Sequence, residues 1–287
     1  MMNEFVIMTD SSSDLPKSVA EDLGVRVIPL EVNMEGDIRL SDEIDIKEFY
    51  DYLRAKHGAK TSAINLDRFT KEFEKVLSEG KDVLYIGFSS GLSATYMASK
   101  NAAEEVLEAH PDRKVIALDS LCASLGQGLL VKLAVDKKNS GATIEEVAEY
   151  VESIKPNLVH WFTVEDLFFL KRGGRVSATT AVVGTMLQIK PILHVDDEGK
   201  LVSMDKVRGR QGSIKALFDK MKATAIEPEK QTVYISHGDC YDDAKKLADM
   251  VREELGVTDI LISEIGPVIG AHSGPGTVAL FYLGTRR

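Results

Sequence analysis

Residues 83–95 read Val83-Leu84-Tyr85-Ile86-Gly87-Phe88-Ser89-Ser90-Gly91-Leu92-Ser93-Ala94-Thr95. The apolar first half predicts a buried strand, and the pattern from residue 93 to residue 109 predicts a long helix. The first N–H groups of such a helix have no partner inside it, and the helix dipole favours negative charge there. Hydroxyl side chains in the turn add uncharged donors. We therefore expect this turn to bind an anionic or carbonyl oxygen.

Similar strand and helix patterns alternate over residues 5–154, which predicts a parallel sheet with helices on both faces. One strand is expected over residues 25–32, where Pro29 indicates an edge or a bulge. Lys155-Pro156-Asn157 marks the expected boundary between two α/β domains, residues 1–156 and 157–287. Strands and helices of the second domain interleave, and a helix is expected over residues 178–188. A hairpin is expected around Asp196-Asp197-Glu198-Gly199.

The composition is that of an ordinary globular protein, with 44% hydrophobic and 28% charged residues. A net charge of −10 argues against a nucleic-acid surface and against docking to anionic lipid by charge alone. Cys122 and Cys240 are far apart and form no redox or metal motif. Neither a signal peptide nor a membrane span is expected, so we predict a cytoplasmic protein.

Polar residues follow three of the predicted strands of the first domain. They are Asp10, Ser89 and Asp119, each with further serines close by. Ligands of open parallel sheets bind beyond the carboxyl ends of the strands, so these residues are candidates for one shared site. The alternative is that each residue only caps the helix or turn that follows it.

Gly87-Phe88-Ser89-Ser90-Gly91 also matches the G-x-S-x-G pattern of serine hydrolases, in a strand–turn–helix context. Ser89 would then be a nucleophile, with His272 or His237 as its base. No His-Gly-Gly type of oxyanion motif precedes it, and two domains do not fit one continuous hydrolase sheet. A serine esterase therefore stays as an alternative function.

Three further features of the sequence are relevant to binding. Residues 266–277 hold four glycines, two prolines and His272, which predicts a rigid loop between two strands. Arginines, suited to carboxylate or phosphate, cluster at Arg172, Arg175, Arg208 and Arg210. Residues 181–187 form an apolar run that suits a core or a deformable lining. No phosphate loop, dinucleotide fingerprint or metal-spaced histidine pair is present, so we expect neither a cofactor nor a metal.

Five motifs, in order and at family spacing over nearly the whole chain, resemble the DegV family. They are Met8-Thr9-Asp10-Ser11-Ser12-Ser13-Asp14, Thr61-Ser62, Ser89-Ser90-Gly91-Leu92-Ser93, Leu170-Lys171-Arg172-Gly173-Gly174-Arg175-Val176 and Gly266-Pro267-Val268-Ile269-Gly270-Ala271-His272. The resemblance implies an N-terminal α/β/α domain with a parallel sheet and a C-terminal two-layer α/β domain with a mixed sheet. It also implies a protein that binds a long-chain fatty acid such as palmitate between its domains.

The implied role is the lipid-binding subunit of a bacterial fatty acid kinase, without catalysis of its own. The chain would present the fatty acid carboxylate to a separate catalytic subunit that makes acyl phosphate from ATP. By motif, Thr61 and Ser93 would bind the carboxylate, with Ser62 and His272 nearby, and Arg175, Arg208 and Arg172 would form the kinase-facing rim. The chain departs from the family at Ala63-Ile64, where Gln-Pro is frequent. A kinase or phosphate-binding protein and a lipid carrier without a kinase partner are further alternatives.

Overall fold

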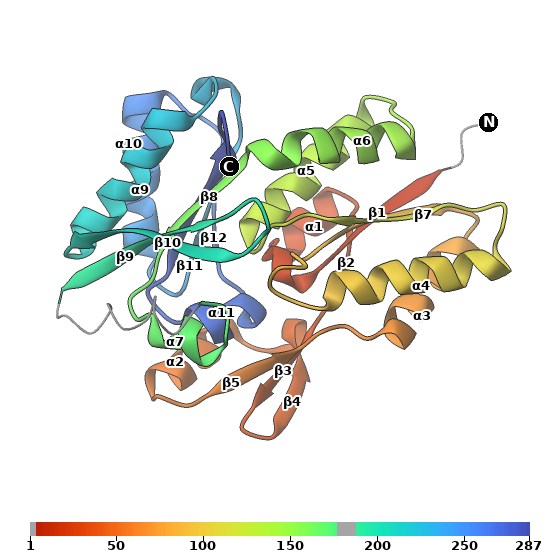
Figure 1. The fold of residues 1–287 in the computed structure, drawn as a ribbon, viewed down its shortest axis with the longest axis horizontal. Coiled ribbons are helices and arrows are strands. Elements are labelled where there is room, and N and C mark those ends of the chain that lie inside the picture. The colour runs from red at the N-terminus through yellow and green to blue at the C-terminus, as the bar shows by residue number, and fades with distance from the viewer. Residues whose placement is uncertain (1–3, 177–187) are drawn as a thin grey trace.

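The computed structural model describes residues 4–176 and 188–287, which form three sheets with helices packed around them (Figure 1). The predicted α/β class is confirmed. The helix predicted over residues 178–188 lies almost wholly outside the described residues, as does the apolar run at residues 181–187.

Sheet A is parallel, with its four strands in the order β2-β1-β6-β7. The strands are β1 (Phe5–Asp10), β2 (Arg26–Ile28), β6 (Asp82–Gly87) and β7 (Val115–Asp119). Each residue of β6 is buried, as a central parallel strand requires. One face is covered by α3 (Leu66–Ser78) and α4 (Thr95–Ala109), and the other by α5 (Leu125–Asn139) and α6 (Ile144–Ile154). This part of the chain therefore has the α/β/α layers expected of it.

The single strand expected over residues 25–32 is wrong, because the chain breaks at Pro29 into two strands of different sheets. After the short helix α1 (Lys17–Asp22), β2 forms the edge of sheet A, and β3 (Glu31–Met34) begins sheet B. Sheet B is antiparallel in the order β4-β3-β5, with β4 (Asp37–Leu40) and β5 (Ala59–Ser62). Proline has no N–H for a strand ladder, which explains the break.

Sheet C is mixed, with six strands in the order β10-β9-β8-β13-β11-β12. They are β8 (Leu158–Thr163), β9 (Ile189–Val195), β10 (Leu201–Arg208), β11 (Val233–His237), β12 (Ile260–Glu264) and β13 (Val278–Leu283). Only the β11–β12 pair is parallel among these described strands. Helices α9 (Arg210–Thr224) and α10 (Tyr241–Leu255) cover one face, which gives the expected two layers. The predicted hairpin joins β9 to β10.

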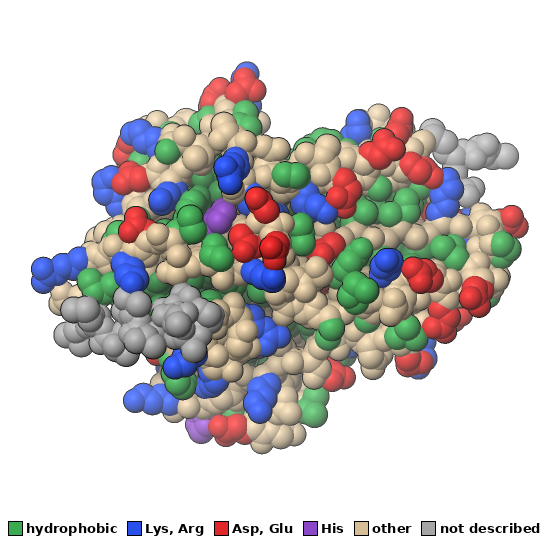
Figure 2. Space-filling model, viewed as in Figure 1, with side chains coloured by type: hydrophobic (Ala, Val, Ile, Leu, Met, Phe, Trp, Pro, Cys, Tyr) green, Lys and Arg blue, Asp and Glu red, His purple; other side chains and the backbone are tan. Residues whose placement is uncertain are grey.

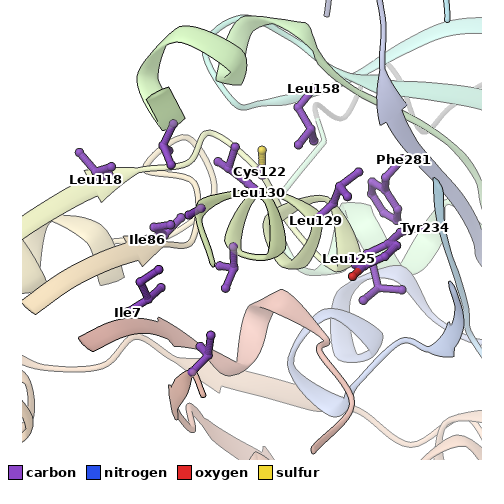
Figure 3. Close-up of a cluster of buried hydrophobic side chains, with 14 of the residues drawn as sticks. Ile7, Ile86, Leu118, Cys122, Leu125, Leu129, Leu130, Leu158, Tyr234 and Phe281 are labelled. Atoms are coloured by element: carbon purple, nitrogen blue, oxygen red, sulfur yellow. The ribbon is translucent and has the colours of Figure 1, made fainter. Parts of the chain in front are cut away.

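Helix α5 lies between sheets A and C and packs against both (Figure 3). Figure 3 shows Leu125 and Leu129 on the side of Tyr234 and Phe281 of sheet C, while Ile7 and Ile86 of sheet A lie on the other side of the cluster. The two halves of the chain thus share one apolar core, and α5 fixes the position of one sheet relative to the other.

The loop expected over residues 266–277 contains a helix, α11 (Pro267–Ser273), so that expectation is corrected. Pro267 is its first residue, where the missing N–H is not needed, and Gly274 ends it at a φ of 77°. Helix α11 packs against α2 (Ile46–Arg54), α7 (Phe168–Arg172) and sheet B. This places His272, near the end of α11, opposite β5.

Candidate functional site

A cavity of about 290 Å³ lies where the loops after sheet A meet sheet C and α11. Its wall is mainly apolar and comes from both halves of the chain; contributing side chains are Phe88, Phe162, Leu170, Val195, Val268 and Phe281. This volume is near the lower end of the range for small-molecule sites, which are typically apolar with a few placed polar groups.

Polar side chains from four separate segments line the same cavity: Thr61, Ser93, Arg175 and His272. Thr61 Oγ1 lies 2.8 Å from His272 Nε2, which joins the end of β5 to the end of α11 across 211 positions of sequence. The sequence therefore identified four residues that the fold brings to one cavity.

His272 is held as a neutral imidazole. Burial, followed by the charges of Arg175 and Arg172, lowers the pKa of His272 from 6.5 to about 4. Its Nδ1 is buried without a hydrogen-bond partner among the described residues. If Nε2 carries the proton, it donates to Thr61 Oγ1, and the Thr61 hydroxyl hydrogen remains available to a ligand oxygen.

Arg175 is fixed beside this pair by two backbone carbonyls. Its Nε donates to the Leu92 carbonyl at 3.3 Å, and its Nη1 donates to the Gly173 carbonyl. Partial burial lowers the pKa of Arg175. The guanidinium thus lies next to the backbone of Ser93, which follows Leu92 in the chain.

Ser93 lies just before α4, which begins at Thr95 instead of residue 93 as expected. Its Oγ accepts the Thr95 N–H at 3.2 Å and lies 2.9 Å from Thr95 Oγ1. When the Thr95 hydroxyl is the donor of that pair, the Ser93 O–H points its hydrogen elsewhere and can bind an anion.

Three other predicted site residues do not line the cavity. Ser62 is exposed at the end of β5, one residue past Thr61 and so on the other face of sheet B. Arg172 lines a separate groove, with its guanidinium 5.0 Å from the Phe169 ring centre. Arg208 is exposed at the end of β10.

The strand-end residues of sheet A lie at one edge, as expected, but they bind the protein itself. Asp10 accepts the Tyr85 hydroxyl at 2.6 Å and the Phe88 N–H at 3.0 Å. Asp119 accepts N–H groups of the loops that follow β6 and β7, both at 3.1 Å. These carboxylates therefore shape the loops, and the capping alternative describes them better than a shared ligand site.

The geometry does not support an esterase based on Ser89. Ser89 is buried, and its hydroxyl donates to the Gly199 carbonyl at 2.8 Å. Neither candidate base pairs with it, because His272 bonds Thr61 and His237 Nδ1 accepts the Cys240 N–H at 3.3 Å. A triad needs a histidine within hydrogen-bond reach of the serine.

The apolar lining from sheet C was not identified from the sequence. His160 and Phe162 of β8 pair with Phe281 and Ala279 of β13, and all four line the cavity. Their neighbours face α9 and α10 instead. Side chains of a strand point alternately to its two faces, so the lining residues of β8 and β13 could have been sought at every second position. Every residue of β8 is buried, however, so a contrast between polar and apolar residues does not distinguish its two faces.

Charges of both signs are interspersed on the face shown in Figure 2. Across residues 4–176 and 188–287, no helix has the length and apolar character needed to cross a bilayer. Within the same residues, no group of three acidic, histidine or cysteine side chains could hold a metal ion.

Known proteins resemble this chain over its whole length. The family model described as "Uncharacterised protein, DegV family" matches residues 4–285. A DegV domain-containing protein of Clostridium perfringens is 45% identical over 286 residues, which cover 99% of this chain and 98% of that protein. Two solved structures are each 32% identical: a DegV lipid-binding protein of Thermotoga maritima, with a TM-score of 0.86, and a fatty-acid-binding DegV protein of Thermus thermophilus, with a TM-score of 0.87. The first alignment covers 99% of both chains, and the second covers 98% of this chain and 99% of its relative. The chain belongs to the DegV family.

Proposed function

We propose that this chain binds a long-chain fatty acid such as palmitate in the cavity and presents its carboxylate to a separate fatty acid kinase subunit. That subunit would transfer phosphate from ATP to form acyl phosphate, so this chain itself would need no cofactor or metal. It would act in the cytoplasm. One observation carries the proposal: the Thr61–His272 pair, Ser93 and Arg175 line a cavity whose wall is otherwise mainly apolar. Solved relatives described as fatty-acid-binding proteins support it.

The polar residues suit a carboxylate head group. A carboxylate removed from water needs hydrogen bonds, and the hydroxyls of Thr61 and Ser93 supply donors without a fixed positive charge. Neutral His272 orients the Thr61 hydroxyl. Arg175 adds a positive charge at the same end, and its own bonds to backbone carbonyls keep it in place.

The apolar wall suits the hydrocarbon tail. Burial of alkyl groups contributes roughly 0.8 kcal/mol per methylene, so a tail of about fourteen methylenes offers on the order of 10 kcal/mol before ordering costs. The tail should therefore dominate affinity, and the polar end should fix which way the ligand lies.

Exposure differs between the two ends in a way that suits presentation. Thr61, Ser93 and Arg175 are each partly exposed, whereas Ala279 and Phe281 of sheet C are 6% and 3% exposed. A head group at the polar end would be reachable from outside while the tail stays dry. Exposed Arg172 and Arg208 are candidates for the surface that meets the kinase subunit.

Native mass spectrometry of the purified chain tests the ligand class. We expect an added mass equal to one fatty acid, and palmitate should replace it. Failure of the chain to retain or bind any fatty acid would overturn the proposal.

Adding a fatty acid kinase subunit and ATP, with hydroxylamine to trap acyl phosphate, tests the second step. Product formation is expected, and Arg175→Ala should keep palmitate bound but reduce transfer. Arg252→Ala, an exposed change on α10, is the control. Palmitate binding without any product with the kinase subunit would favour a plain lipid carrier.

A further inference from the structure

Asp14 is a buried acidic residue that lies outside the lining of the cavity. It follows the 3-10 turn after β1, has a φ of 50°, and is 8% exposed. Its Oδ2 accepts the Ser124 hydroxyl at 2.5 Å, and its Oδ1 accepts the Gly266 N–H at 2.9 Å. Both of these bonds reach segments more than 100 positions away.

Each partner of Asp14 begins an element of the cavity. Ser124 precedes α5, lines the cavity itself, and has its Oγ 3.0 Å from Ser236 Oγ of sheet C. Gly266 is the N-cap of α11, the helix that carries His272. One carboxylate therefore joins the loop after β1 to the starts of α5 and α11.

The contact with Gly266 is close. A Cβ atom at position 266 would stand 2.9 Å from Asp14 Oδ1, so glycine is what allows the bond. On the other side, the Tyr50 hydroxyl of α2 donates to the Ile265 carbonyl at 2.8 Å. The chain is thus held from two directions at the point where α11 begins, and the far end of α11 meets Thr61.

We propose that Asp14 is a positioning residue of the cavity: its bonds to Gly266 and Ser124 fix α11, and so place His272 against Thr61 for the ligand head group. A buried carboxylate is unfavourable unless its oxygens are bonded, and an apolar side chain would fill the same space without that penalty. An acceptor with two oxygens, however, can hold two donors from separate segments at once.

The test builds on the proposed function and compares palmitate with methyl palmitate, which has the same tail but no carboxylate. The affinity ratio of the two ligands measures head-group recognition. In Asp14→Asn, assayed at pH 8 so that Asp14 of the wild type is ionised, we expect the ratio to fall about tenfold. This is the effect of losing one charge-assisted hydrogen bond, and methyl ester affinity should stay near wild type. If Asp14 only stabilised the fold, Asp14→Asn would weaken the binding of both ligands by the same factor.

Asp82→Asn is the matched control, because Asp82 is also buried but lies at the opposite, amino end of β6 and bonds the Lys114 N–H. Its ratio should equal that of wild type. Gly266→Ala disturbs the bond between Asp14 and Gly266 while Asp14 stays intact, and it replaces Asp14→Asn in the comparison if that variant does not fold. It should lower the ratio as well. An unchanged ratio in Asp14→Asn, or in Gly266→Ala where Asp14→Asn does not fold, overturns the inference, whereas wild type that binds neither ligand overturns the proposed function.

Discussion

Gly173 lies so close to His272 that a Cβ atom at position 173 would stand 2.3 Å from His272 Nδ1. Gly173 ends α7, and His272 is near the end of α11, so the two helices meet at this point. The backbone of Gly173 does not require glycine, since its φ is −71°. The residue is therefore needed for space, to let the histidine ring lie between α7 and Thr61.

Gly173→Ala should displace His272 and weaken palmitate binding by about tenfold, the loss expected when one hydrogen-bonded group is misplaced. The added methyl group meets the ring itself, which cannot move without losing Thr61. Isothermal titration with palmitate measures the effect. Gly212→Ala in α9 is the control, because nothing lies within 4 Å of its Cβ position. Unchanged binding in Gly173→Ala would show that His272 does not depend on this contact.

Ser93→Ala should also weaken palmitate binding, by roughly tenfold, because both a ligand donor and the acceptor of the Thr95 N–H are lost. Ser90→Ala removes an exposed hydroxyl from the same turn and should leave binding unchanged. Displacement of a fluorescent fatty acid gives both affinities. Equal affinities of the two variants would remove Ser93 from the carboxylate site.

Local patterns were enough to predict most helices and strands of this fold. Thr143 and Glu146 form the reciprocal cap that begins α6, near the predicted position. The alternation of β6 with its flanking helices gave the parallel sheet. Sheet B was missed because β4 is largely exposed and only four residues long, so no apolar run marks it. Its strands are defined mainly by their pairing with β3.

Motifs were enough to predict which polar residues line the cavity, but not that Thr61 and His272 form a hydrogen bond with each other. Thr61 and His272 are 211 positions apart, and only the packing of α11 on sheet B brings them together. Asp14 belongs to one of the motifs, but its role could not be predicted because its partners Ser124 and Gly266 are distant in sequence. Residues that act through tertiary hydrogen bonds leave no local periodicity to detect.

Stability should fall in acid partly because His272 is buried without its charge. Burial, with a smaller effect of Arg175 and Arg172, lowers the pKa of His272 from 6.5 to about 4. Between these values the unfolded chain binds more protons, so the free energy of unfolding decreases as the pH falls from 6.5 toward 4. Urea unfolding at pH 7.5 and 4.5 should show wild type losing roughly 1–2 kcal/mol relative to His272→Gln, a value reduced for partial exposure. Parallel losses in the two proteins would contradict the assignment.

Asp14 should have the opposite pH dependence. Burial raises the pKa of Asp14 from 3.8 to about 7, opposed by its bonds to Ser124 and Gly266 and increased slightly by Asp10. The native state then holds a proton that the unfolded chain has released, so this contribution to stability is complete below pH 3.8 and disappears as the pH rises through about 7. From pH 5 to pH 8, wild type should lose roughly 2–3 kcal/mol of unfolding free energy relative to Asp14→Asn. Tyr50, a further titratable group near Asp14, stays protonated over this range because burial raises its pKa well above 10, so it does not contribute to the difference between the two proteins. A difference that stays constant across this range would mean that Asp14 is already ionised at pH 5, and that its two hydrogen bonds outweigh the effect of burial.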